Sequence, residues 1–261
     1  MRNKNFRSLI SFILLVIITC TYVTLKDFDF TELLKHETEQ TTVKQVTSNA
    51  KISDLGYPEW SYEEYPDYYA ENGPAVIDES KFPKKGNINY TGKDSLGRTL
   101  AVYGTITYKM VEKSAKETRP DFKPDDNPSG WSKNKKVTVE TSTGPYNEGW
   151  FWNRSHLIAD SLGGAALKVN AITGTRTQNV GENNTGGMAY IEEKLRQFFE
   201  NPTNETVFYE VKPVYTGNEL IPRVVEINVK SSDGSIDEHI LVYNTAKGYI
   251  INYNDGTFTK G

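Results

Sequence analysis

The stretch Trp150-Phe-Trp-Asn-Arg-Ser-His-Leu-Ile158 runs from aromatic to apolar residues and predicts a buried strand that carries His156 near its end. Gly163-Gly164 then breaks the chain, and a polar, glycine-rich run follows from Gly174 to Met188. From Met188 to Phe199 the apolar residues recur with a helical period, which predicts a helix that ends before Asn201-Pro202. We interpret the rest of the chain around this order of strand, loop and helix.

On both sides of this unit the pattern is that of strands. Upstream, Thr99–Tyr108 is predicted as a strand, residues 109–135 as a loop-rich stretch and Lys136–Thr141 as a half-exposed strand. Downstream, three further strands are predicted at 206–215, 223–230 and 239–244, with turns between them. Strands, one helix and then strands predict an α+β fold around an antiparallel sheet.

The N-terminus predicts export. Basic residues among the first seven precede an apolar segment, Leu9–Leu25, which is typical of a signal peptide or a membrane anchor. The positive-inside rule places the rest of the chain outside the cell. We therefore expect a signal peptide or anchor at 1–25, a polar tether at 26–55 and one domain at 56–261, in which Tyr57–Pro83 packs against the domain edge.

Cysteine content and charge limit the classes of protein. The single cysteine, Cys20, lies in the apolar segment, so the exported part has no internal disulfide. Residues 1–25 carry three of the 30 basic residues and no acidic ones, which leaves 27 basic against 34 acidic residues and a net charge of −7. This charge argues against tight binding of nucleic acid over a large surface, but not against catalysis at a local positive site.

The candidate chemical residues gather around His156. It is one of three histidines, and it alone follows an arginine at the end of a predicted strand, although a core histidine bonded to a backbone carbonyl would show the same pattern. The glycine-rich run delivers Asn179, Asn183 and Asn184 just before the helix. A histidine-bearing hairpin, a loop and a helix preceded by an amide oxygen are the parts of a ββα-metal finger. The asparagines could equally serve as a helix N-cap and turn residues.

Several motifs in order resemble the DNA/RNA non-specific endonuclease family, and most of all its secreted or membrane-anchored streptococcal branch. The resemblance covers roughly residues 88–255. Two departures stand out, because Asn153 and Ser155 replace the Asp and Gly of the family's Asp-Arg-Gly-His signature. The motifs are Leu96-Gly-Arg98, Arg119 with Pro128-Ser-Gly-Trp131, Asn153-Arg-Ser-His156 with Leu157–Gly164, Thr175-Arg-Thr-Gln178, Lys212-Pro-Val-Tyr215 and Pro222-Arg223.

The resemblance implies a metal-dependent, sequence-non-specific endonuclease that hydrolyses DNA, and possibly RNA, outside the cell. His156 would be the general base, because a histidine is mostly neutral at physiological pH. Magnesium, for which manganese can substitute, would be held by one neutral asparagine. Asn183 has the family's spacing from Gln178, and Asn179 and Asn184 remain alternatives.

The remaining roles follow from the same resemblance. Glu192 on the helix would hold metal-bound waters. Arg154 would be a catalytic residue that binds the phosphate oxygens. Arg98 and Arg176 would bind substrate, although each arginine could instead form a surface ion pair. The alternative function is a non-catalytic cell-surface protein that binds nucleic acid for uptake, which would use the same groove without needing His156.

Overall fold

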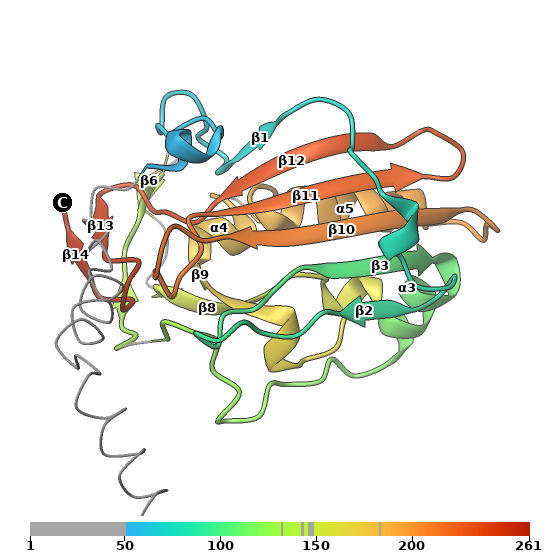
Figure 1. Cartoon of the computed structure of the whole chain (residues 1–261), viewed down its shortest axis with the longest axis horizontal. Coiled ribbons are helices and arrows are strands. Elements are labelled where there is room, and N and C mark those ends of the chain that lie inside the picture. Colours follow the sequence, from blue (N-terminus) through green and yellow to red (C-terminus); the bar gives the residue numbers. More distant parts are fainter. Residues whose placement is uncertain (1–50, 132, 142–143, 146–148, 183) are drawn as a thin grey trace, which may run out of the picture. The chain divides into compact units, whose positions relative to one another are not determined.

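The computed structural model describes residues 51–131, 133–141, 144–145, 149–182 and 184–261 (Figure 1). Contacts along the chain divide it between Thr47 and Ser48, and every described residue belongs to the second unit. The predicted signal peptide or anchor lies outside the described residues. Within the described ranges, no helix is both long and apolar enough to cross a membrane.

A six-stranded antiparallel sheet forms the centre of the fold, with strand order β1-β12-β11-β10-β3-β2. The predicted α+β fold is confirmed. Each long strand predicted from alternating apolar residues is present, because one face of the sheet must bury those residues. The strands are β1 (Tyr69–Glu71), β2 (Ile88–Tyr90), β3 (Val102–Thr107), β10 (Thr206–Val214), β11 (Val224–Ser231) and β12 (Asp237–Tyr243).

The segment before β2 belongs to the same folded unit. The predicted packing of Tyr57–Pro83 against the domain edge is confirmed, because β1 pairs with β12 at the edge of the sheet (Figure 1). Further upstream, Ile52–Leu55 forms the 3-10 helix η1, although the sequence assigns these residues to the tether. Ile52 is buried against Val224 and Leu241, so ordered packing reaches at least to this residue.

Helix α5 (Met188–Phe198) confirms the helix predicted from the apolar period. Its buried residues Met188, Ile191 and Leu195 belong to the main core cluster together with residues of β10 and β11. Figure 1 shows α5 lying across one face of the sheet. The short helix α4 (Arg176–Val180) precedes α5 and contacts it. Both helices lie on the same side of the strands (Figure 1).

The predicted loop after Tyr108 is wrong at its start, where the chain forms helix α3 (Tyr108–Lys116). The hydroxyl of Thr107 caps this helix by accepting a hydrogen bond from the Met110 amide. Tyr108, Met110 and Val111 pack against the core, while the lysines and glutamates of the helix face solvent. The helix ends at Glu117, shortly before Pro120.

The short strands form separate pairs. Where one strand is predicted at Lys136–Thr141, the structure has two, β4 and β5, which pair with β7 and β6 respectively. A C-terminal hairpin, β13 with β14, is not predicted from the sequence. Their bounds are β4 (Lys136–Val137), β5 (Glu140–Thr141), β6 (Gly144–Pro145), β7 (Gly149–Trp150), β13 (Tyr249–Ile251) and β14 (Phe258–Lys260); η2 (Glu79–Lys81), η3 (Asp160–Leu162) and η4 (Lys168–Asn170) are 3-10 helices.

Candidate active site

A two-stranded hairpin, β8 (Trp152–His156) with β9 (Ala171–Thr175), carries the predicted histidine at its end. His156 pairs with Ala171 at the mouth of the loop that joins the strands. The fully buried side chain of Asn170 fixes the backbone that follows, because it accepts a hydrogen bond from the Ile158 amide and donates to the Ile158 carbonyl. The short helix α4, which is not predicted from the sequence, packs on both strands, and the predicted helix α5 in turn contacts α4.

The imidazole of His156 is buried, with 6% of the residue exposed, and its Nε2 atom has no hydrogen-bond partner among the residues that the structure describes. Phe122 lies against it, with ring centroids 4.6 Å apart. Burial lowers the pKa of His156 to about 4, and the positive charge of Arg119 acts in the same direction. The histidine is therefore neutral at physiological pH and able to accept a proton.

Arg119 connects the histidine with α5. Its charge lowers the pKa of His156 and also opposes the rise in the pKa of Glu192, so both side chains lie within its electrostatic reach. Arg119 itself is exposed. In the sequence, Arg119 stands out only as part of a motif. In the structure, its exposed guanidinium lies within electrostatic reach of the histidine.

Glu192 is partly buried on α5, and the tyrosine hydroxyl of Tyr209 lies in its electrostatic reach without a hydrogen-bond partner. Desolvation raises the pKa of Glu192 to about 7, against the opposing charges of Arg119 and Arg196. A carboxyl in this position changes its protonation state easily when a cation approaches. Perturbed groups of this kind gather at functional sites.

Asn179 is held close to the strand that carries the histidine. The hydroxyl of Ser155 donates a hydrogen bond to the Asn179 amide oxygen at 3.0 Å, which holds α4 to the end of β8. Asn183 lies outside the described residues. Asn184 is exposed, has a positive φ of 60° and accepts a hydrogen bond from Arg176 at 3.4 Å. Among the described asparagines of this run none caps a helix, because Thr175 caps α4 and Gly187 begins α5.

Arg154 braces the loop that carries Arg119 and Phe122. Its guanidinium donates to the Asn127 side chain at 3.0 and 2.8 Å and to the Pro124 carbonyl at 3.1 Å. It also lies over the rings of Phe122 and Trp131. These contacts orient the loop over His156, and a direct role of Arg154 on phosphate stays a prediction.

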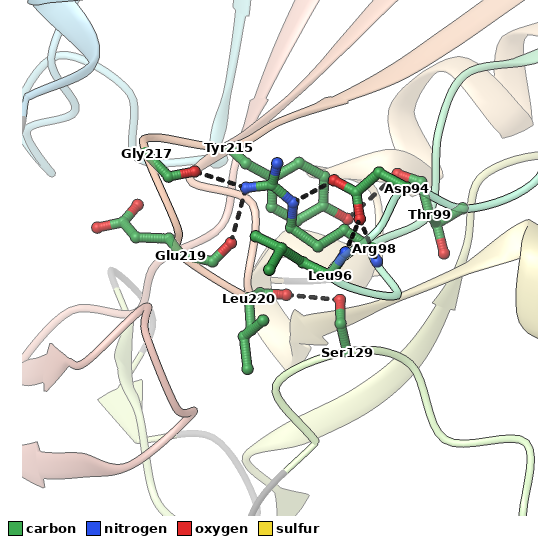
Figure 2. A network of polar contacts seen from close by, with 9 residues as sticks. All are labelled: Asp94, Leu96, Arg98, Thr99, Ser129, Tyr215, Gly217, Glu219 and Leu220. Atoms are coloured by element: carbon green, nitrogen blue, oxygen red, sulfur yellow. Dashed lines mark hydrogen bonds and ion pairs between the residues drawn. The ribbon is translucent and has the colours of Figure 1, made fainter. Parts of the chain in front are cut away.

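Arg98 sits in a separate polar network, shown in Figure 2. Its Nε donates to Asp94 at 2.6 Å, its Nη1 donates to the Gly217 and Glu219 carbonyls, and the guanidinium lies over Tyr215 at 4.7 Å. In the part of the chain that the structure describes, no contact joins Arg98 to His156, Asn179 or Glu192. The network ties the Asp94–Thr99 turn to the β10–β11 connection, and substrate binding by Arg98 and Arg176 stays a prediction.

The residues present fit a divalent cation that keeps most of its waters. The described residues contain no group of three or more His, Cys, Asp or Glu side chains that could enclose a metal. They do offer an amide oxygen on Asn179 and a carboxyl on Glu192. Both amide atoms of the buried Gln178, on the same short helix as Asn179, lack hydrogen-bond partners. Oxygen donors and few protein ligands suit magnesium or manganese better than the nitrogen and sulfur sets of structural zinc.

Three comparisons relate this chain to known proteins. A family model described as DNA/RNA non-specific endonuclease matches residues 77–233. A deoxyribonuclease from Streptococcus dysgalactiae subsp. equisimilis is 35% identical over 243 residues, which is 75% of this chain and 74% of that protein. The solved structure of Sda1 nuclease with a bound zinc ion is 35% identical, with a TM-score of 0.74, and covers 78% of this chain and 100% of that chain. NucA from Streptococcus agalactiae with a bound magnesium ion, at 20% identity and a TM-score of 0.58 over 75% of this chain and 88% of that chain, shares the fold.

The chain is a nuclease, an enzyme that hydrolyses phosphodiester bonds, and its fold is that of the solved nucleases. The chain belongs to the DNA/RNA non-specific endonuclease family. The family is metal-dependent and acts on DNA, so the resemblance predicted from the motifs is confirmed.

Proposed function

We propose that this chain is a magnesium-dependent endonuclease that cuts DNA outside the cell, with RNA as a second candidate substrate and His156 as the general base. The observation that carries the proposal is the buried, unpaired Nε2 of His156 beside the exposed guanidinium of Arg119. A neutral base and a cation next to it are what hydrolysis of a charged phosphodiester requires.

His156 takes the proton from the attacking water. Its low pKa keeps the imidazole neutral, and the Phe122 ring and the buried setting hold its orientation. The hairpin end fixes the position, since Asn170 locks the residues that follow. General-base catalysis of this kind contributes about 100- to 10,000-fold to rate.

Arg119 binds the phosphate. Its guanidinium fork can contact two non-bridging oxygens at once, and it is exposed enough to receive a substrate. Arg154 supports this role because it holds the same loop through hydrogen bonds to Asn127 and Pro124. The positive site is therefore local, which agrees with the negative net charge of the whole chain.

Asn179 would hold the cation through its amide oxygen, and Glu192 would accept hydrogen bonds from the waters around it. When bound, a divalent cation supplies positive charge at the scissile phosphate and at the leaving oxygen. We favour Asn179 over the predicted Asn183 because the Ser155 hydrogen bond fixes the Asn179 oxygen next to the histidine strand. Asn184 is a weaker candidate, since it is exposed and its side chain contacts Arg176 and not the histidine strand.

Action outside the cell rests on the N-terminal sequence, in which basic residues precede the apolar segment Leu9–Leu25. Whether this segment is cleaved or anchors the protein in the membrane does not change the site.

The test is degradation of plasmid DNA by the full-length protein with magnesium, with manganese and with EDTA. We expect cleavage with either ion, none in EDTA, and recovery when magnesium is restored, because a single neutral ligand binds the cation weakly. A parallel incubation with single-stranded RNA measures the RNA activity. Undiminished cleavage of DNA in EDTA would contradict the mechanism.

A further inference from the structure

Residues 181–182 and 184–187 lie between the two helices that carry Asn179 and Glu192, and are called the turn below. Gly187 packs closely against α4, because a Cβ atom on it would clash with the Gln178 carbonyl oxygen. The Gly181 amide donates to the Thr177 carbonyl at 2.7 Å. Because each helix is attached to one end of this turn, we expect its displacement to change the distance between Asn179 and Glu192.

An upstream segment, residues 62–71, contacts this turn from outside. The Asp67 carbonyl accepts a hydrogen bond from the Gly187 amide at 2.8 Å. Gly186 leaves just enough room for this approach, because a Cβ atom there would clash with the same carbonyl oxygen. The hydroxyl of Tyr62 donates to the Glu182 carboxylate at 2.7 Å. Glu182 is 1% exposed, so this hydrogen bond compensates a buried charge.

The segment is itself rigidly held. Tyr68 is fully buried with a positive φ of 62°, a strained conformation that persists only where the surroundings enforce it. Its ring stacks on Trp60 at 5.3 Å, and its hydroxyl accepts from the Lys247 amide. Tyr69 then stacks on Tyr190 of α5 at 4.1 Å. The segment thus connects the sheet edge with both the turn and α5.

We propose that residues 62–71 are a positioning element of the nuclease site, which sets the separation of Asn179 and Glu192 and thereby the affinity for the divalent cation. This proposal rests on the proposed function, in which these two residues serve the cation. The element lies outside the match to the family model, which begins at residue 77.

The test compares two full-length variants that each lose one hydroxyl from the same segment. Tyr62→Phe removes the hydrogen bond to Glu182, whereas Tyr65→Phe removes the hydrogen bond to the exposed Glu64 and the hydroxyl contact with Tyr243, neither of which lies in the turn. Binding of Mn²⁺ to the metal-free proteins is measured by the paramagnetic signal of free Mn²⁺. Amide hydrogen exchange of residues 178–188 is followed by mass spectrometry.

In Tyr62→Phe we expect a Kd for Mn²⁺ about threefold to tenfold higher, because one hydrogen bond to a buried charge is lost. Exchange in the turn should be faster, and DNA cleavage lost at low Mn²⁺ should return at saturating Mn²⁺. Tyr65→Phe should match the wild type in all these measurements. Equal Mn²⁺ affinity and equal exchange in the two variants would overturn the proposal.

Gly186→Ala probes the same contact from the other side, because its Cβ would push against the Asp67 carbonyl. A folded Gly186→Ala protein should show the same direction of change, and unchanged Mn²⁺ affinity in it would contradict the proposal. A wild-type protein that neither binds Mn²⁺ nor cuts DNA would overturn the proposed function. Wild-type binding, with no difference between the Tyr62 and Tyr65 variants, overturns the positioning role alone.

Discussion

The hydroxyl of Ser155 donates a hydrogen bond to the amide oxygen of Asn179 at 3.0 Å. The residue that precedes the proposed general base thus also orients the proposed metal ligand. Because an amide oxygen has two lone pairs, Asn179 can accept from Ser155 and still bind a cation. This hydrogen bond ties the end of β8, which carries the proposed base, to α4, which carries the proposed ligand.

The first prediction distinguishes the three asparagines. Asn179→Ala should reduce cleavage of plasmid DNA by at least about 100-fold at physiological magnesium, whereas Asn184→Ala should keep most of the activity. Initial rates over a magnesium titration measure both. If Asn183→Ala were inactive and Asn179→Ala active, the spacing from Gln178 would be the better guide to the metal ligand.

The second prediction concerns Arg119. Arg119→Ala should lower kcat/KM for DNA by about 100-fold or more, because it removes the cation that binds the phosphate. The matched control is Arg196→Ala, which removes a charge that also acts on Glu192 but pairs with the exposed Glu193. Equal, small losses in both variants would show that Arg119 has no special role.

The third prediction is a gain of stability when Glu192 is neutralised. Its pKa of about 7 in the folded protein lies above the ordinary value of 4.5, so the stability present at low pH is lost as pH rises through about 7. At about pH 8, Glu192→Gln should raise the free energy of unfolding of the metal-free protein by up to about 3 kcal/mol. Near pH 4.5 the gain should vanish.

Urea unfolding in EDTA at both pH values measures this difference, and Glu193→Gln is the control on the exposed neighbour. A gain for Glu192→Gln that did not depend on pH would contradict burial as the cause. The same variant should lose activity, because the carboxylate needed around the cation is gone.

Much of the fold follows from local pattern. Helix α5 is predictable because its apolar residues repeat with the helical period and pack on the sheet, and the long strands because they alternate. Helix α3 is missed, since its apolar residues are only half buried and lie at its start, before a lysine-rich stretch and three prolines. In such a stretch the Thr107 cap is the remaining signal.

The site is less predictable than the fold. The position of His156 at a strand end is readable, because the apolar run before it defines the strand. The position of Arg119 beside the histidine is not readable, because long-range contacts hold its loop there: those of Arg154 with Asn127 and Pro124, and that of Phe122 with His156. For the same reason Arg98, singled out by its motif, turns out to hold a turn through Asp94. Long-range side-chain contacts decide these positions, and sequence spacing does not contain them.

The fourth prediction is the pH dependence of cleavage. The general base must be neutral, and the pKa of His156 is about 4. Glu192, whose pKa is about 7 in the metal-free protein, must be ionised, and bound magnesium favours its carboxylate form. At saturating magnesium, activity should therefore be retained well below pH 6.5 and fall only as pH drops through about 4. Arg119→Ala should move this fall to higher pH, since the positive charge that disfavours protonation is removed. Circular dichroism at each pH confirms that the protein stays folded. A fall centred near 6.5 would mean that His156 is more exposed to water than the structure shows.

The proposed mechanism depends on His156 as the general base. The most direct test is the rate of plasmid cleavage by full-length His156→Ala at saturating magnesium. We expect the rate of cleavage to fall by about 100- to 10,000-fold, with DNA binding and the unfolding transition nearly unchanged. Added imidazole should restore part of the activity of His156→Gly, because the small base can enter the space beside Phe122. A folded His156→Ala protein that cuts DNA at the wild-type rate would contradict the account.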